Sequence, residues 1–329
     1  MRMRTDRVLR VGVASAVAAC TVLAVSAQRS TDRDILFDSN LDVNAKEIWV
    51  IRADGSGLRP LTKSPKDSSN GVPRWSPDGL RIVFASTRHA PARVPLEESA
   101  TEIYTMNRDG SGLQRLTYGP KASVDPDWSG DGKHIAFVSN RDGDWKIYVM
   151  DANGSNVRRM TTDQITNPSK SETGPAWSSD GKRIAFVSNR DGEKNEIYIM
   201  QLETSIVTRV TNNDAWDAHP PWSPDSQYLS FDSTRDGDWE IYLMRPDGSQ
   251  VVRLTDHPRM DNAARWSRDG KRLAFNSTRD WDSDDLGNCE IYVMNRDGSS
   301  VRRLTTNSIK DTHPDWSEQS GLSDLGLGE

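Results

Sequence analysis

The chain of 329 residues is poor in cysteine, with only Cys20 and Cys289. Cys20 lies in an N-terminal segment that we expect to be removed, so one thiol remains and no intramolecular disulfide can form. Small exported domains commonly rely on disulfides for stability. For this chain we expect stability to come from a packed core instead.

The sequence also lacks the short motifs of the common enzyme classes. It contains no Gly-x-Ser-x-Gly nucleophile elbow, no phosphate-binding glycine-rich loop with a lysine, no His-Glu-x-x-His and no Cys-x-x-Cys. Each of these motifs places a nucleophile, a phosphate cradle or metal ligands at a required spacing. We therefore expect a protein without catalytic activity.

A basic tract is missing as well. The chain has 42 Lys and Arg against 48 Asp and Glu, and residues 1–27 hold four of the arginines and one aspartate. The remaining chain then carries a net charge of about −9. A surface of this sign repels phosphate backbones, so we exclude nucleic acid as the main partner.

An apolar run is present at the N-terminus. Four arginines precede an uncharged, largely apolar stretch over residues 11–25, and Val25-Ser26-Ala27 supplies the small residues of a signal-peptidase site. The stretch is too short for a stable membrane span. We predict a signal peptide over residues 1–27 and a periplasmic or secreted protein. The alternative is a lipoprotein anchored through Cys20, because Val17-Ala18-Ala19-Cys20 loosely fits a lipoprotein cleavage box.

One pattern recurs along the rest of the chain. A Trp-Ser pair leads into a strand-like run, an Arg-Asp-Gly turn, a second run, an Asp-Gly-Ser turn and a final Arg-Leu-Thr. The tryptophans are 53, 49, 45 and 44 residues apart: Trp75, Trp128, Trp177, Trp222 and Trp266. Asp-Gly pairs favour tight hairpins, and β-branched and aromatic residues favour strands. Four short strands in a unit of this length are typical of a β-propeller blade.

The two ends of the repeat region complement each other. The first unit begins at Ile35 without a Trp-Ser strand, and the chain ends with an extra copy of that piece at residues 313–317. Together they make one blade, which leaves no open sheet edge. We predict an all-β protein, a six-bladed β-propeller over residues 35–317 in which the C-terminal strand closes the first blade. Residues 28–34 would be a short linker and residues 318–329 a tail.

The repeated Pro-x-Trp-Ser-x-Asp-Gly, Ile-Ala-Phe-x-Ser-x-Arg-Asp-Gly and Ile-Tyr-x-Met sequences resemble the WD40-like (PD40) repeats of the TolB family. The resemblance covers residues 35–317 and implies protein recognition in the cell envelope, with a Pal-like lipoprotein as the partner it suggests. Only about seven residues separate the expected cleavage site from the first blade, so we expect no N-terminal α/β domain of the TolB kind. Peptidase and polysaccharide lyase propellers carry similar blades, so a carbohydrate-binding or lyase-like propeller is the alternative.

Candidate binding residues lie just ahead of the Trp-Ser pairs, where the repeats disagree with one another. Inner strands line the channel of a propeller, so variable positions there indicate a channel mouth freed from packing. Carboxylates and imidazoles suit a partner's basic group or a divalent cation. We predict an exposed partner-binding surface formed by seven residues: Asp125, Glu172, Asp217, His219, Asp261, Asp311 and His313. The alternative is that these side chains only cap loops.

Two unrepeated loops complete the candidates. Asp280, Asp282 and Asp284 alternate like the start of a calcium loop, although the glycine and the final glutamate of such a loop are missing. A solvated acidic loop is the alternative, and calcium is the one cofactor we consider. The loop over residues 89–101 is a second candidate for a partner surface. The sequence thus predicts an exported, monomeric, non-catalytic binding propeller.

Overall fold

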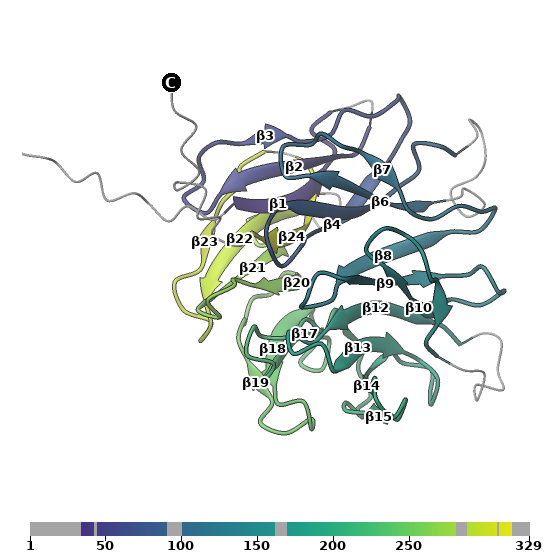
Figure 1. The fold of residues 1–329 in the computed structure, drawn as a ribbon. Helices are drawn as coiled ribbons and strands as arrows, with labels where there is room; N and C mark the ends of the chain where they lie inside the picture. Colours follow the sequence, from purple (N-terminus) through teal and green to yellow (C-terminus); the bar gives the residue numbers. More distant parts are fainter. Residues whose placement is uncertain are drawn as a thin grey trace, which may run out of the picture. The chain divides into compact units, whose positions relative to one another are not determined.

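The computed structural model describes residues 34–42, 45–90, 101–161, 170–280, 288–307 and 309–317. Within these ranges the chain forms 24 strands and no helix. The strands make six four-stranded antiparallel sheets, which follow one another around a ring (Figure 1). The predicted six-bladed β-propeller is confirmed.

Each blade contributes four strands, in order from the channel outward. Blade 1 consists of β24 (Asp311–Trp316), β1 (Asp34–Ser39), β2 (Glu47–Arg52) and β3 (Arg59–Pro60), and blade 2 of β4 (Asn70–Trp75), β5 (Arg81–Ser86), β6 (Glu102–Asn107) and β7 (Gln114–Arg115). Blade 3 consists of β8 (Ser123–Trp128), β9 (His134–Ser139), β10 (Lys146–Asp151) and β11 (Arg158–Arg159), and blade 4 of β12 (Glu172–Trp177), β13 (Arg183–Ser188), β14 (Glu196–Gln201) and β15 (Val207–Arg209). Blade 5 consists of β16 (Asp217–Ala218), β17 (Leu229–Ser233), β18 (Glu240–Met244) and β19 (Val252–Arg253), and blade 6 of β20 (Asp261–Trp266), β21 (Arg272–Ser277), β22 (Glu290–Asn295) and β23 (Arg302–Arg303).

The second and third strands of each blade are apolar at successive positions because both faces of the sheet are covered. In β9, Ile135 and Phe137 pack in one cluster with residues of blade 2, whereas Ala136 and Val138 pack with residues of blade 4. Burying a side chain as large as Phe137 stabilises the fold by about 2 kcal/mol or more. The core is therefore a series of layers between neighbouring blades.

The ring closes within blade 1. The C-terminal strand β24 pairs antiparallel with β1, with Trp316 opposite Ile35 and Asp311 opposite Ser39. At the end of this pairing the amide N–H of Asp34 donates to Ser317 Oγ at 2.9 Å. The C-terminal strand thus completes the first sheet, as the sequence predicts.

The inner strands share a bulge at the third residue before tryptophan. Every residue at this position has a positive φ: Val72, Asp125, Gly174, His219, Ala263 and His313. The strand pairing shifts at the same place, for example between Val124 and Asp127. The bulge interrupts the ladder next to the channel.

Alternating strand direction gives the ring two faces. The Trp-Ser turns and the Asp-Gly-Ser turns lie at one face, which we call the Trp-Ser face. The Arg-Asp-Gly turns and the connections between blades lie at the other, which we call the Arg-turn face. The channel mouth predicted from the sequence belongs to the Arg-turn face.

Several predicted features lie outside the described residues. They are the signal peptide, Cys20, most of the loop over residues 89–101, and the candidate calcium ligands Asp282 and Asp284. Across the described ranges, no helix has the length and apolar character needed to cross a membrane.

Candidate functional site

The channel enclosed by the inner strands contains two cavities. One, of about 90 Å³, lies among the Trp-Ser turns, and the other, of about 290 Å³, lies at the Arg-turn face. Arg74, Ala176 and Arg265 line both cavities. Charged side chains therefore divide the channel where the two cavities meet.

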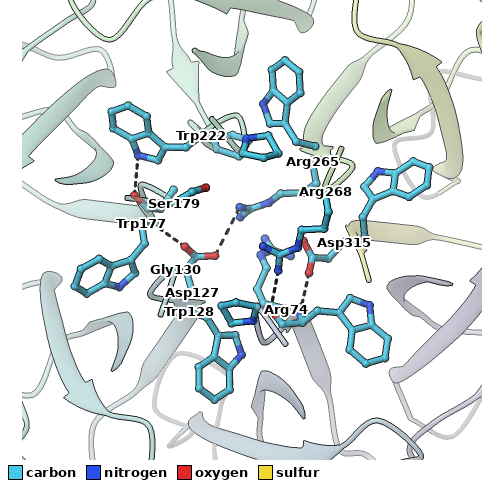
Figure 2. Close-up of a pocket in the computed structure, with 17 residues that line it drawn as sticks. Arg74, Asp127, Trp128, Gly130, Trp177, Ser179, Trp222, Arg265, Arg268 and Asp315 are labelled. Carbon is cyan, nitrogen blue, oxygen red and sulfur yellow. Dashed lines mark hydrogen bonds and ion pairs between the residues drawn. The ribbon is translucent and has the colours of Figure 1, made fainter. Parts of the chain in front are cut away.

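Tryptophans surround the smaller cavity, and charged side chains from the preceding residues point toward its middle (Figure 2). Asp127 Oδ2 accepts a hydrogen bond from the amide N–H of Trp177 at 2.8 Å. Asp315 Oδ2 accepts one from the amide N–H of Trp75, also at 2.8 Å. Each of these aspartates therefore ties its own blade to the next one in the ring.

The arginines between the two cavities keep a positive charge. Arg74 is buried, and burial together with the nearby Arg265 lowers the pKa of Arg74 to about 10, which still leaves it protonated at neutral pH. Arg265 Nη1 lies 3.8 Å from Asp127 Oδ1, and burial raises the pKa of Asp127. Within the described part of the chain, Arg74 Nε has no acceptor. A ligand entering from the Arg-turn face would meet these guanidinium groups.

The larger cavity contains three of the residues predicted from the sequence. Asp125, His219 and His313 come from three different blades, and each occupies the bulge position of its inner strand. The positive φ at this position removes the residue from regular pairing. Trp216, whose exposed fraction is 39%, and Trp239 line the same cavity. Carboxylate, imidazole and indole groups thus meet at one mouth of the channel.

Each of these two histidines pairs with a buried aspartate of its own blade. His219 Nδ1 lies 2.6 Å from Asp232 Oδ2, and His313 Nδ1 lies 2.9 Å from Asp38 Oδ2. Burial lowers the pKa of His313, against the attraction of Asp38. Burial opposes the ionisation of Asp38, but Lys46 and His313 outweigh it and hold the pKa of Asp38 well below its usual range. The pairs orient the imidazoles toward the cavity.

The other four predicted residues do not line the channel mouth. Glu172, Asp217, Asp261 and Asp311 are the first residues of their inner strands, and none has any solvent exposure. Arg190, Arg235 and Arg279, from the turns after the second strands, pair with the first three of them. The expectation that these positions are exposed was wrong, because residue variation at a repeat position reflects a change of partner as readily as freedom from packing.

Glu172 shows such a change of partner. In blade 3, Lys146 stands where the third strand of every other blade begins with glutamate. Four of those glutamates accept a hydrogen bond from a threonine of their own blade, such as Thr211 to Glu196 at 2.6 Å. In blade 3, Thr161 donates instead to Glu172 of blade 4, and the amide N–H of Ile147 donates to Glu172 Oε2 at 3.2 Å. The longer side chain at Glu172 thus replaces a missing carboxylate.

The candidate calcium residue that the structure describes has protein partners. Tyr292 donates its hydroxyl hydrogen to Asp280 Oδ2, and Arg303 Nη1 lies 3.3 Å from the same oxygen. Tyr148, Tyr198 and Tyr242 donate to the matching aspartates of their blades. Among the described residues, no group of three or more His, Cys, Asp or Glu side chains could hold a metal ion.

Sequence reasoning missed Asp38, Asp232 and the arginines of the channel. Asp38 and Asp232 lie in second strands where blades 2, 3 and 4 have Ala85, Val138 and Val187. A carboxylate within an otherwise apolar buried strand is a detectable signal, because it requires a partner. The blades that carry these aspartates are also the ones with histidine at the bulge. The thiol of Cys289 is buried, and burial raises its pKa to about 11, so it is not a nucleophile at neutral pH.

Comparisons with known proteins agree with this architecture. The family model for the TolB beta propeller domain, PD40, matches residues 91–174 and 163–281, which together exceed half of the chain. The Agrobacterium fabrum protein Atu1656 is 32% identical over 114 residues, 35% of this chain and 35% of that protein. The Tol-Pal system protein TolB of Anaeromyxobacter dehalogenans is 32% identical over 108 residues, 33% of this chain and 22% of that protein. The chain thus spans about a third or less of the length of these relatives.

Solved structures show the same fold at low identity. The crystal structure of TolB from Acinetobacter baumannii has a TM-score of 0.68 and 19% identity, and covers 87% of this chain and 66% of that one. The tricorn protease has a TM-score of 0.60 at 15% identity, covering 84% of this chain and 27% of that one. An oligogalacturonate lyase in complex with manganese has a TM-score of 0.50 at 15% identity, covering 83% of this chain and 74% of that one. TolB, the tricorn protease and an oligogalacturonate lyase thus share this fold.

Proposed function

Because the chain belongs to the TolB β-propeller (PD40) family, we propose that it is an exported, non-catalytic module that binds a protein through the larger channel cavity. The observation that supports this most is the placement of Asp125, His219 and His313. These unlike residues stand at one repeated backbone position and face one cavity, next to the exposed indole of Trp216. The rest of each blade repeats because it builds the scaffold.

The cavity suits a short polar segment of a protein. Its volume of about 290 Å³ is at the lower end of the range for small-molecule pockets. Asp125 offers an acceptor for a basic group, the two imidazoles offer further hydrogen bonds, and Trp216 offers an apolar surface with an N–H donor. The arginines at the bottom of the cavity stop the segment from passing through. We propose a Pal-like lipoprotein of the envelope as the partner, reached after export through the signal peptide.

The test compares variants of the channel mouth that keep the melting temperature of the wild-type protein. The purified propeller would be exposed to envelope extract, the bound protein identified by mass spectrometry, and its affinity measured again with both purified proteins. We expect the Asp125→Ala, His219→Ala double variant to bind at least about 30-fold more weakly, as for residues central to an interface. His134→Ala is the matched control, because His134 is a comparably exposed histidine on the Trp-Ser face. Equal affinity of the double variant and the control would exclude the channel mouth.

A carbohydrate ligand is the second candidate, because Trp216 and Trp239 lie together in the cavity. Indole faces can support a sugar ring as well as a peptide. Incubation of the protein with acidic oligosaccharides, followed by analysis of their length, separates the two proposals. Shortened products, lost in the Trp216→Ala variant, would favour a lyase-like propeller and contradict the non-catalytic role.

A further inference from the structure

In five blades the arginine that follows the second strand lies in the same receptor, formed by a Phe, a Tyr and the first residue of the inner strand. In blade 5 the guanidinium carbon of Arg235 lies 4.9 Å from the ring centre of Phe231 and 4.9 Å from that of Tyr242. Nη2 of Arg235 lies 3.2 Å from Asp217 Oδ1, on the first residue of the inner strand. The arginines of the other four blades lie over the equivalent Phe and Tyr and reach the equivalent side-chain oxygen: Arg88, Arg141, Arg190 and Arg279.

Blade 1 keeps this receptor but has leucine in place of the arginine. The amide N–H of Leu41 donates to Ser39 Oγ at 3.2 Å, as that of Arg235 donates to Ser233 Oγ at 3.2 Å, so the two residues are equivalent. Phe37 pairs across the strands with Trp49, as Phe231 pairs with Tyr242. The inner strand again begins with aspartate, Asp311.

Asp311 and Asp217 have matching surroundings apart from the arginine. Asn307 Nδ2 lies 2.7 Å from Asp311 Oδ2, and Asn213 Nδ2 lies 2.8 Å from Asp217 Oδ2. Asp217 Oδ1 also accepts a hydrogen bond from Arg235, whereas Asp311 Oδ1 has no hydrogen-bond partner among the described residues. Asp311 has no solvent exposure, and among the described residues no cation pairs with its carboxylate. A buried carboxylate in this condition gains much from an incoming cation.

The arginines of the other blades support a binding site at this position. Side chains of Arg190, Arg235 and Arg279 in the other receptors remain 16%, 23% and 15% exposed, so this place in a blade borders solvent. Leu41, at the position of these arginines, is likewise half-buried.

We propose that blade 1 contains a guanidinium-binding site, formed by Asp311, Phe37 and Trp49, that takes an arginine side chain of a partner polypeptide. Guanidinium fits better than ammonium because it is planar, weakly hydrated and able to stack on aromatic rings while it donates to a carboxylate. All five occupied receptors of the same chain show the stacking on aromatic rings, and those of Arg190, Arg235 and Arg279 also show the contact with a carboxylate. The site lies on the Arg-turn face but outside the channel lining, so it is independent of the cavity proposed above.

The experiment uses three short peptides as probes. Acetyl-Gly-Arg-Gly-amide would be titrated into the protein while the indole N–H signal of Trp49 is followed by NMR, with that signal assigned by its loss in Trp49→Tyr. The lysine peptide tests the need for a planar cation, and the citrulline peptide tests the need for charge. Ethylguanidinium distinguishes recognition of the guanidinium alone from recognition of a peptide. We expect saturable, millimolar binding of the arginine peptide and of ethylguanidinium, and a shift at least tenfold smaller with the other two.

Variants supply the controls. Leu41→Arg places the repeat's own arginine in the receptor, so it should abolish peptide binding and raise the melting temperature. Asp311→Asn should abolish peptide binding without raising the melting temperature. Arg235→Ala opens the matching receptor of blade 5, where the arginine peptide should restore part of the lost melting temperature.

The proposal fails if the four probes shift the Trp49 signal alike, or if Leu41→Arg still binds the arginine peptide. Loss of peptide binding in Leu41→Arg would support this site even if the Asp125 and His219 variants kept full affinity for the envelope partner, because the two sites share no residue. If Arg235→Ala does not fold, the Leu41→Arg comparison still decides the result.

Discussion

Asp38 Oδ2 lies 2.9 Å from Nδ1 of His313, although 275 positions separate the two residues in the sequence. The other oxygen of Asp38 contacts Lys46 Nζ at 2.6 Å and the hydroxyl of Thr312 at 2.5 Å. The amide N–H of Val72, in blade 2, donates to Asp38 Oδ2 at 2.9 Å. One buried carboxylate thus joins the first strand, the C-terminal strand and the next blade.

We expect Asp38→Ala to destabilise the protein more than any other single aspartate change in a second strand. Removing the carboxylate leaves Lys46 and His313 without their shared partner and releases the C-terminal strand, at a cost of about 3–5 kcal/mol. Asp232→Ala is the matched control, because Asp232 contacts His219 and the N–H of Ala263 but does not join the chain ends. Urea unfolding measures both. A larger loss in Asp232→Ala would contradict a special role in closure.

Stability should fall as the pH rises from about 4 to about 7 through Asp311 and Glu290. Burial raises the pKa of Asp311 to about 6 and that of Glu290 to about 7, and the charge of Asp311 adds to the rise at Glu290. In this range the folded state binds more protons than the unfolded state, so a rise in pH favours unfolding.

Urea unfolding at a series of pH values measures this slope, and the difference between wild type and variant isolates the two groups. Asp311→Asn and Glu290→Gln should each make the slope less negative. Leu41→Arg should do the same, because it supplies a cation beside Asp311. Unchanged slopes in all three variants would show that the two carboxyls titrate as in the unfolded chain.

Substitutions at Lys146 of blade 3 and Glu172 of blade 4 should have strongly non-additive effects on stability. Lys146→Glu places a second carboxylate beside buried Glu172, and we expect a loss of about 2–3 kcal/mol. Glu172→Asp shortens the side chain that accepts from Thr161, and we expect a loss of about 1–2 kcal/mol. The double variant restores the arrangement of the other blades, so its loss should be at least about 1 kcal/mol smaller than the sum. Additive losses in unfolding experiments would contradict the inference that Glu172 replaces the carboxylate missing from blade 3.

Val72 carries backbone strain that glycine would relieve. Its φ of 53° is in the left-handed region, where a β-branched side chain is strongly disfavoured. We expect Val72→Gly to raise the free energy of unfolding by about 1 kcal/mol. Val83→Gly, in the regular strand β5, is the control and should lower it, because it removes buried packing. Destabilisation of both variants alike would show that Val72 is not strained.

The sequence by itself determined the blades and their number. Hairpin turns, strand lengths and the apolar runs are local properties, and the six copies of the pattern confirmed one another. The missing strand at Ile35 and the extra strand ending at Trp316 predicted ring closure, because an incomplete sheet needs a partner edge. Each of these features is recognised from residues close together in the chain, although the inference of closure joins features of its two ends.

Only the tertiary structure decided which variable residues face the channel. Asp217 and His219 are two positions apart and look equally free in the sequence, yet one is paired with Arg235 inside the blade and the other faces the cavity. The bulge separates them, because a positive φ turns the chain between a buried first residue and the channel. The link between Asp38 and His313 likewise exists only because closure of the ring brings the two ends of the chain into contact, and a carboxylate without water must take its partner from whatever the fold places beside it.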